Sequence, residues 1–98
     1  MILHTVVFRL SHKLGSLEER EFLHKIAELA YIPGVEDFKL LRQISDKNDF
    51  DFGLSMEFAS HQTYDAYNEH PMHQTFVNEV WLQEVADFME IDFQPLND

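Results

Sequence analysis

Two histidines, a tyrosine and a proline lie within the seven residues from Tyr67 to His73. Pro71 suits the first position of a helix, which would place His70 at the helix start and His73 in the first turn. The positive end of a helix dipole disfavours an imidazolium, so His73 would stay neutral and able to accept a proton. With the phenol of Tyr67 nearby, it forms a workable acid–base pair. Histidines at a helix start also serve simply as caps, and the spacing alone leaves both interpretations open.

Length and composition limit the classes of protein to consider. A chain of 98 residues forms one domain with a single core, so we expect one domain over 1–98. The chain has no cysteine, which removes disulfides, thiol nucleophiles and thiolate metal sites. It has neither the pattern of a signal peptide nor an apolar run of the ~20 residues that span a bilayer. We therefore expect a cytoplasmic protein without a membrane partner.

The net charge of −11 is unevenly distributed along the chain. All seven Lys and Arg lie at or before Lys47, whereas eleven acidic residues and no Lys or Arg follow from Asn48 onward. Nucleic acids and anionic membrane surfaces require a basic surface, so we expect neither as a partner. A solvated acidic surface that aids solubility explains the charge better than a metal site does.

Hydrophobic periodicity predicts six elements. Residues 2–10 alternate as a strand with His4 on its more apolar face, and Ser16 with Glu19 forms a capping box for a helix to about residue 30. Strands are predicted over 35–44, 50–58 and about 87–93, and a second helix over 60–68 and 71–82 is interrupted at Pro71. The order β-α-β-β-α-β predicts an α+β, ferredoxin-like fold with an antiparallel sheet covered by both helices on one face.

Several segments of the predicted elements form a recognisable set: residues 4–8, 32–35 and 52–58, Tyr67 with the His-Pro-x-His motif of 70–73, and Asp92-Phe93. Through them the sequence resembles the stress-responsive A/B barrel (Dabb) family over nearly its whole length. The resemblance implies a dimeric α+β barrel built from ferredoxin-like protomers. It does not imply one activity, because family members include stress-linked and structural proteins as well as a plant polyketide cyclase.

The cyclase suggests roles for three residues of the present chain. Its base corresponds to His73, the tyrosine that assists the base corresponds to Tyr67, and a first-strand histidine in its cavity corresponds to His4. Two other cavity positions differ, because Phe52 and Lys25 stand where the cyclase has His and Tyr.

Two functions follow from these residues. The first is a stress-related or assembly protein of unassigned activity, in which the polar residues form a buried network near the His-Pro-x-His motif. The alternative is a small-molecule enzyme of the aldol or proton-transfer type, with His73 as base, Tyr67 as hydrogen-bond donor and His4 sharing or orienting the proton. Its apolar wall would bind a small apolar or aromatic ligand, and we expect it to comprise Phe8, Phe22, Phe52, Leu54, Met56 and Trp81. An open cavity beside His73 favours the enzyme, and a filled one favours the structural protein.

A metal site is a third, weaker hypothesis. His4, His70 and His73 could supply three nitrogen ligands, but no carboxylate is convincingly placed to complete the set. We therefore expect no metal and no cofactor.

The uncovered sheet face predicts a homodimer. Leu3, Thr5 and Val7 from the first strand, joined by Phe88 from the last, would form an apolar patch beside the small residues Gly53 and Ser55. Patches of this kind usually mark an interface, and a two-fold pairing through the sheets would cover both copies.

Overall fold

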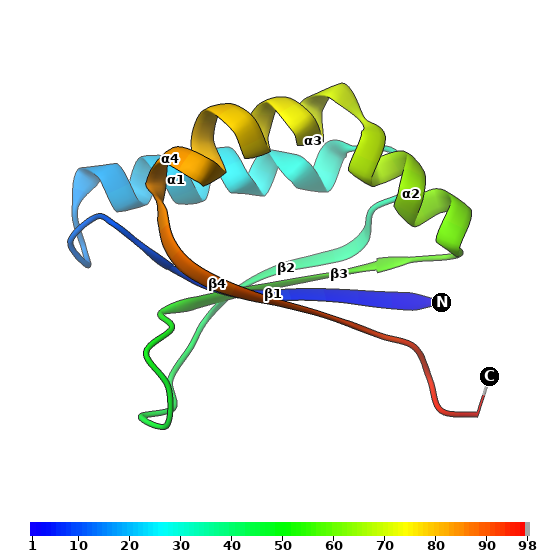
Figure 1. Ribbon diagram of the computed structural model, residues 1–98, viewed down its shortest axis with the longest axis horizontal. Coiled ribbons are helices and arrows are strands. Elements are labelled where there is room, and N and C mark those ends of the chain that lie inside the picture. The colour runs from blue at the N-terminus through cyan, green and yellow to red at the C-terminus, as the bar shows by residue number, and fades with distance from the viewer. Residues whose placement is uncertain (98) are drawn as a thin grey trace.

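One four-stranded antiparallel sheet, in the order β2-β3-β1-β4, carries all the helices on one of its faces (Figure 1). The computed structural model describes residues 1–97. The elements are β1 (Ile2–Leu10), α1 (Leu17–Ala27), the 3₁₀ turn η1 (Glu28–Tyr31), β2 (Glu36–Arg42), β3 (Phe52–Phe58), α2 (His61–Glu69), α3 (Pro71–Phe76), the π-helical turn η2 (Val77–Trp81), α4 (Leu82–Glu84) and β4 (Val85–Phe93). The predicted ferredoxin-like order is confirmed.

Local sequence signals fix the helix starts. The hydroxyl of Ser16 accepts a hydrogen bond from the Glu19 backbone N–H at 3.2 Å, and the Glu19 carboxylate accepts one from the Gly15 N–H, which is the predicted capping box. His70 caps α3 in the same way, because its Nδ1 accepts from the Met72 N–H at 3.1 Å. The predicted helix over 71–82 changes into the π-helical turn η2 after Phe76, and β4 begins at Val85, two residues earlier than predicted.

The core lies between the sheet and the helix layer. It is built from alternate residues of β1 and β3 and from the inner faces of α1, α2 and α3. At one end, the ring of Phe8 packs against those of Phe22, Phe52 and Trp81 at centroid distances of 5.8, 5.5 and 5.2 Å. This aromatic cluster anchors the first helix and the end of η2 onto the two central strands.

Strand β4 faces the opposite way to the sequence prediction. Phe88 pairs with Phe8 and Phe93 pairs with Leu3, and paired residues share one face of a sheet. Phe88 therefore lies on the helix side, where it meets Trp81 edge to face at 5.4 Å, and its predicted place in the outer patch is wrong. The outer face receives Met89, Ile91 and Phe93 instead, and each of these side chains is about half exposed.

The turn between η1 and β2 requires glycine at position 34. Gly34 has φ +93°, and a Cβ there would collide with the Thr63 side chain of α2. Gly15 also has positive φ, at +81°, but a Cβ there would meet open space.

We therefore expect Gly34→Ala to lower the free energy of unfolding by more than Gly15→Ala does. Gly15→Ala, the control, should cost about 1 kcal/mol, because alanine disfavours the left-handed backbone. In Gly34→Ala the collision with the Thr63 side chain should add to that cost. Urea denaturation of both variants measures the difference. Equal losses would mean that the contact with Thr63 is relieved without cost.

No helix within residues 1–97 is both long and apolar enough to cross a membrane.

Candidate active site

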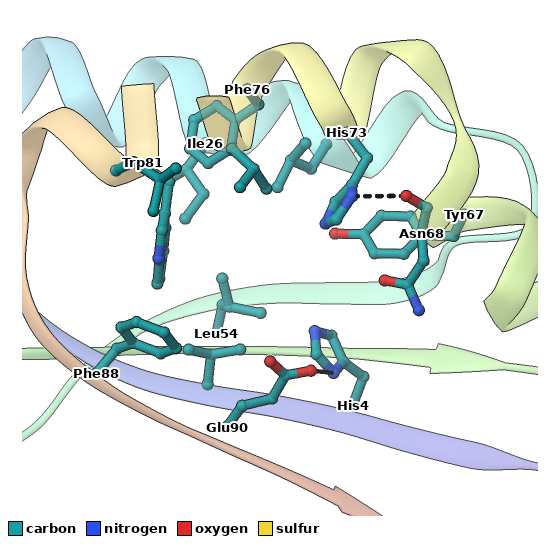
Figure 2. A pocket seen from close by; sticks show the side chains of 14 residues that line it. His4, Ile26, Leu54, Tyr67, Asn68, His73, Phe76, Trp81, Phe88 and Glu90 are labelled. Carbon is teal, nitrogen blue, oxygen red and sulfur yellow. Dashed lines mark hydrogen bonds and ion pairs between the residues drawn. The ribbon is translucent and has the colours of Figure 1, made fainter. Parts of the chain in front are cut away.

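A cavity of about 270 Å³ lies between the sheet and the helix layer, and it contains the three residues that the sequence singled out (Figure 2). His4 enters it from β1, Tyr67 from α2 and His73 from α3. The remaining lining is mostly apolar and comprises Val6, Ile26, Leu29, Leu54, Asn68, Phe76, Val77, Trp81, Leu82, Phe88 and Glu90. The exposed members of this set are Asn68, Leu82, Phe88 and Glu90, and the last two lie on the edge strand β4, so the cavity opens to solvent beside this strand.

His73 is held as a neutral imidazole with one free nitrogen. Its Nδ1 lies 3.1 Å from the backbone oxygen of Asn68 and donates to it, so the proton sits on Nδ1 and the Nε2 lone pair remains available. Burial lowers the pKa of His73 below its usual 6.5, and nearby His4 lowers it further, while the bond to Asn68 and the charge of Glu90 partly oppose them. A neutral imidazole in a cavity is suited to accept a proton.

Tyr67 lies between the two histidines as a neutral phenol. Its ring centroid is 4.5 Å from that of His73 and 6.3 Å from that of His4, and only 2% of the residue is exposed. Burial raises the pKa of Tyr67, and the negative charge of Glu90 raises it further. The hydroxyl, which points into the cavity beside His73, therefore keeps its proton and can donate a hydrogen bond to a bound molecule (Figure 2).

His4 is oriented by residues that the sequence analysis did not select. Its Nδ1 lies 2.6 Å from Asp92 Oδ1 and 2.9 Å from the Tyr64 hydroxyl, which itself donates to Asp92 Oδ2 at 2.8 Å. A carboxylate partner fixes the proton on Nδ1, which leaves Nε2 of His4 directed toward Tyr67 and His73 (Figure 2). Asp92 is paired directly with His4 across β1 and β4. This partner could have been predicted only from the register of the last strand, which the sequence analysis did not assign.

Only two of the six predicted wall residues line the cavity. Leu54 and Trp81 do so, whereas Phe8, Phe22, Phe52 and Met56 are at most 3% exposed and pack inside the core. Apolar alternation cannot separate a core position from a cavity wall, because both require the same residue types. The wall also contains Val77 of η2 and Phe88 and Glu90 of β4, which the sequence analysis had not assigned to it.

The structure does not bring His4, His70 and His73 to the spacing of metal ligands, and Nδ1 of His70 accepts the cap hydrogen bond of α3. Within residues 1–97, the group with ligand spacing is His4, Glu90 and Asp92, whose candidate atoms lie within 4.8 Å of one another. Nδ1 of His4 already donates its proton to Asp92, and a metal ion would have to displace that proton. This geometry is better explained as a hydrogen-bonded pair.

Burial of His73 predicts a specific pH dependence of stability. Because the folded-state pKa lies below the unfolded value of about 6.5, the unfolded chain binds the proton more readily. The contribution of neutral His73 to stability is therefore complete above pH 6.5 and is lost as the pH falls through the lower, folded-state pKa. Urea denaturation at pH 7.5 and 5.5 should show a smaller loss of stability in His73→Gln than in the wild type; equal losses would contradict a desolvated His73.

Comparison with known proteins places the chain in a family. The family model of the stress responsive A/B barrel domain (Dabb) matches residues 2–95. A Dabb family protein of Mesorhizobium loti with a ferredoxin-like fold is 52% identical, with a TM-score of 0.97 over 98% of this chain and 97% of that one. Comparison with curated proteins gave no match.

More distant structures share the fold. A protein of unknown function from Thermobifida fusca is 19% identical, with a TM-score of 0.78 over 96% of this chain and 90% of that one, and it is one of three such neighbours described as dimeric. A hydroxynitrile lyase from Passiflora edulis is 14% identical, with a TM-score of 0.84 over 99% and 94% of the two chains. The fold is thus shared by proteins of unknown function and by an enzyme, and the match over residues 2–95 shows that this chain belongs to the stress-responsive A/B barrel (Dabb) family.

Proposed function

We propose that this Dabb protein is a small-molecule enzyme that moves a proton at a carbon next to a carbonyl group. One observation carries the proposal: the space beside His73 is an open cavity of about 270 Å³ rather than packed core. A buried network with a purely structural role would place its polar atoms against one another. Here the Nε2 atoms of His4 and His73 and the hydroxyl of Tyr67 are directed into the same space (Figure 2).

The three side chains have complementary roles in this reaction. Nε2 of His73 takes the proton from the carbon, because its imidazole is neutral and its Nδ1–H is anchored on the Asn68 carbonyl. The hydroxyl of Tyr67 donates a hydrogen bond to the carbonyl oxygen, where negative charge develops as the enolate forms. Its raised pKa keeps the phenol protonated, so it acts as a donor rather than as a base.

His4 supports the reaction from the sheet side. Held by Asp92 and Tyr64, its Nε2 can receive the proton that His73 removes, or return one to the substrate. The apolar surface of Leu54, Ile26 and Trp81 supports catalysis by holding an apolar substrate body and limiting water near the enolate.

Hydrogen–deuterium exchange tests this function with a simple ketone in place of the natural substrate. Phenylacetone, a neutral single-ring ketone, has exchangeable protons next to its carbonyl. We expect the wild-type protein in D₂O to accelerate their loss, measured by proton NMR, above the rate with heat-denatured protein at equal concentration. If the protein accelerates exchange neither for this ketone nor for a panel of cyclic and aryl ketones, the proposed activity is wrong. The alternative, a non-enzymatic stress-related or assembly protein, is then favoured.

We also infer that the protein is a homodimer that pairs through the uncovered sheet face. This face carries Leu3 and Val7 of β1, Leu41 of β2, and Met89, Ile91 and Phe93 of β4. The β2 and β4 members of this set are each about half exposed, although they are large and apolar. Gly53 and Ser55 lie between them and leave room for a second sheet to approach. Exposed apolar patches of this kind mark interfaces, and the neighbours described as dimeric support a dimer.

A further inference from the structure

Negative charge is concentrated on the β4 side of the cavity. Nδ1 of His4 lies 2.6 Å from Asp92 Oδ1 and 3.7 Å from Glu90 Oε1. One imidazole can neutralise at most one carboxylate. This side of the cavity therefore carries net negative charge even when His4 is protonated.

The other walls of the cavity contain no permanently charged cation. Among the described residues that line the cavity, none is Lys or Arg. Lys25 of α1 belongs to a separate groove between α1 and α3, and the segment that supplies α2, α3 and β4 lies wholly beyond the last basic residue, Lys47. An anionic ligand would lose its hydration on entry without finding a cation to replace it.

Glu90 is the member of this acidic pair that faces a ligand most directly. It lines the cavity, its side chain is half exposed at the mouth, and its remaining contact is with the Tyr64 hydroxyl at 3.3 Å. Asp92, by contrast, is engaged by both His4 and Tyr64. A molecule that enters past β4 therefore meets the Glu90 carboxylate before it reaches the two imidazoles.

The cavity volume limits the size of the ligand. A dry apolar cavity of ~150 Å³ accommodates benzene. The present cavity, at about 270 Å³, therefore has room for one six-membered ring with a short substituent.

We propose that this cavity selects neutral or cationic single-ring molecules and rejects carboxylates, with Glu90 as the residue that determines this selectivity. The inference rests on the proposed function only in using the same cavity, and it concerns which molecules bind rather than which reaction follows. It predicts a neutral carbonyl compound or an amine, rather than a free acid, as the natural ligand.

Three ring ligands of similar size and different charge test the selectivity: benzylamine, benzyl alcohol and benzoate. Binding is measured at pH 7.5 and low salt through the methyl NMR signals of Ile26 and Leu54, which report on this cavity and not on the groove beside Lys25. We expect benzoate to bind on the order of tenfold more weakly than benzyl alcohol, and benzylamine at least as tightly. Added salt should reduce the difference, because the mouth is exposed to water.

The variant Glu90→Gln keeps an oxygen to accept the Tyr64 hydrogen bond and removes the charge. It should reduce the difference in affinity between benzoate and benzyl alcohol several-fold. The control is Glu79→Gln, which changes an exposed acidic residue of η2 outside the cavity lining and should leave this difference in affinity unchanged. Equal affinity of the wild type for benzoate and benzyl alcohol, or an unchanged difference in Glu90→Gln, would overturn the selectivity and leave the proposed reaction standing. Failure of all three ligands to shift the cavity signals would overturn the selectivity and the ligand cavity together.

Discussion

The variant His73→Gln is expected to lose at least about a hundredfold in the rate of ketone exchange, while its free energy of unfolding at pH 7.5 changes by less than about 1 kcal/mol. The rate falls because an amide cannot accept the proton at neutral pH. Stability is preserved because His73 faces a cavity, so its replacement leaves no packed void, and a Gln side chain can still donate to the Asn68 carbonyl. The measurement is proton NMR of phenylacetone in D₂O, with urea denaturation of the same samples.

Two further variants separate catalysis from structure. Tyr67→Phe should lose less activity than His73→Gln, because it removes one hydrogen bond worth about 1–3 kcal/mol in a desolvated site. His24→Gln, on the exposed face of α1, should retain the wild-type rate. If His73→Gln mainly unfolds the protein and its folded fraction exchanges at the wild-type rate, His73 has a structural role and the proposed mechanism fails.

The variant Val7→Asp is expected to abolish the dimer. Val7 lies at the centre of the outer sheet face, where it pairs with Gly53 on one side and Met89 on the other. A carboxylate there would be taken out of water between two sheets, which costs several kcal/mol. Light scattering should report about twice the chain mass of 11.6 kDa for the wild type at micromolar concentration, and the monomer mass for the variant.

The control for this prediction is Leu17→Asp, which introduces the same charge at an exposed apolar position on α1, away from the sheet. It should remain dimeric. The melting temperature of the wild type should rise with protein concentration, as it does for a folded state stabilised by association. A wild-type monomer at micromolar concentration, with Val7→Asp equally soluble and stable, would contradict an interface on this face.

The sequence was sufficient to predict the elements and their order, because the signals involved are local. Alternation in residues 2–10 and 52–58, the Ser16–Glu19 box and the Pro71 restart each act within a few residues of the structure that they determine. The faces of β4 could not be assigned in the same way. The more apolar set, Met89, Ile91 and Phe93, faces outward, whereas the rule that apolar residues face the core predicts the opposite orientation.

For the candidate site, too, local sequence signals predicted the residues but not their long-range partners. His4, Tyr67 and His73 were identified from residue type and motif, and the structure places them on one cavity. The partners of His4 were not identified, because Asp92 reaches it across 88 residues through strand register alone. In β4 the polar set faces the cavity and the more apolar set faces outward, the reverse of an ordinary edge strand. That reversal is explained if the outer face is an interface and the inner face holds His4.

Nitrogen-detected NMR of the histidine side chains tests the central claim most directly, namely that His73 presents a neutral, unprotonated Nε2 to a ligand cavity. At pH 7.5 the account predicts that His73 is in the Nδ1–H tautomer and that its Nε2 resonance shifts when benzyl alcohol is added, whereas the exposed His24 does not respond. A His73 that carries its proton on Nε2, or whose resonances are unchanged by the ligand, would contradict the account.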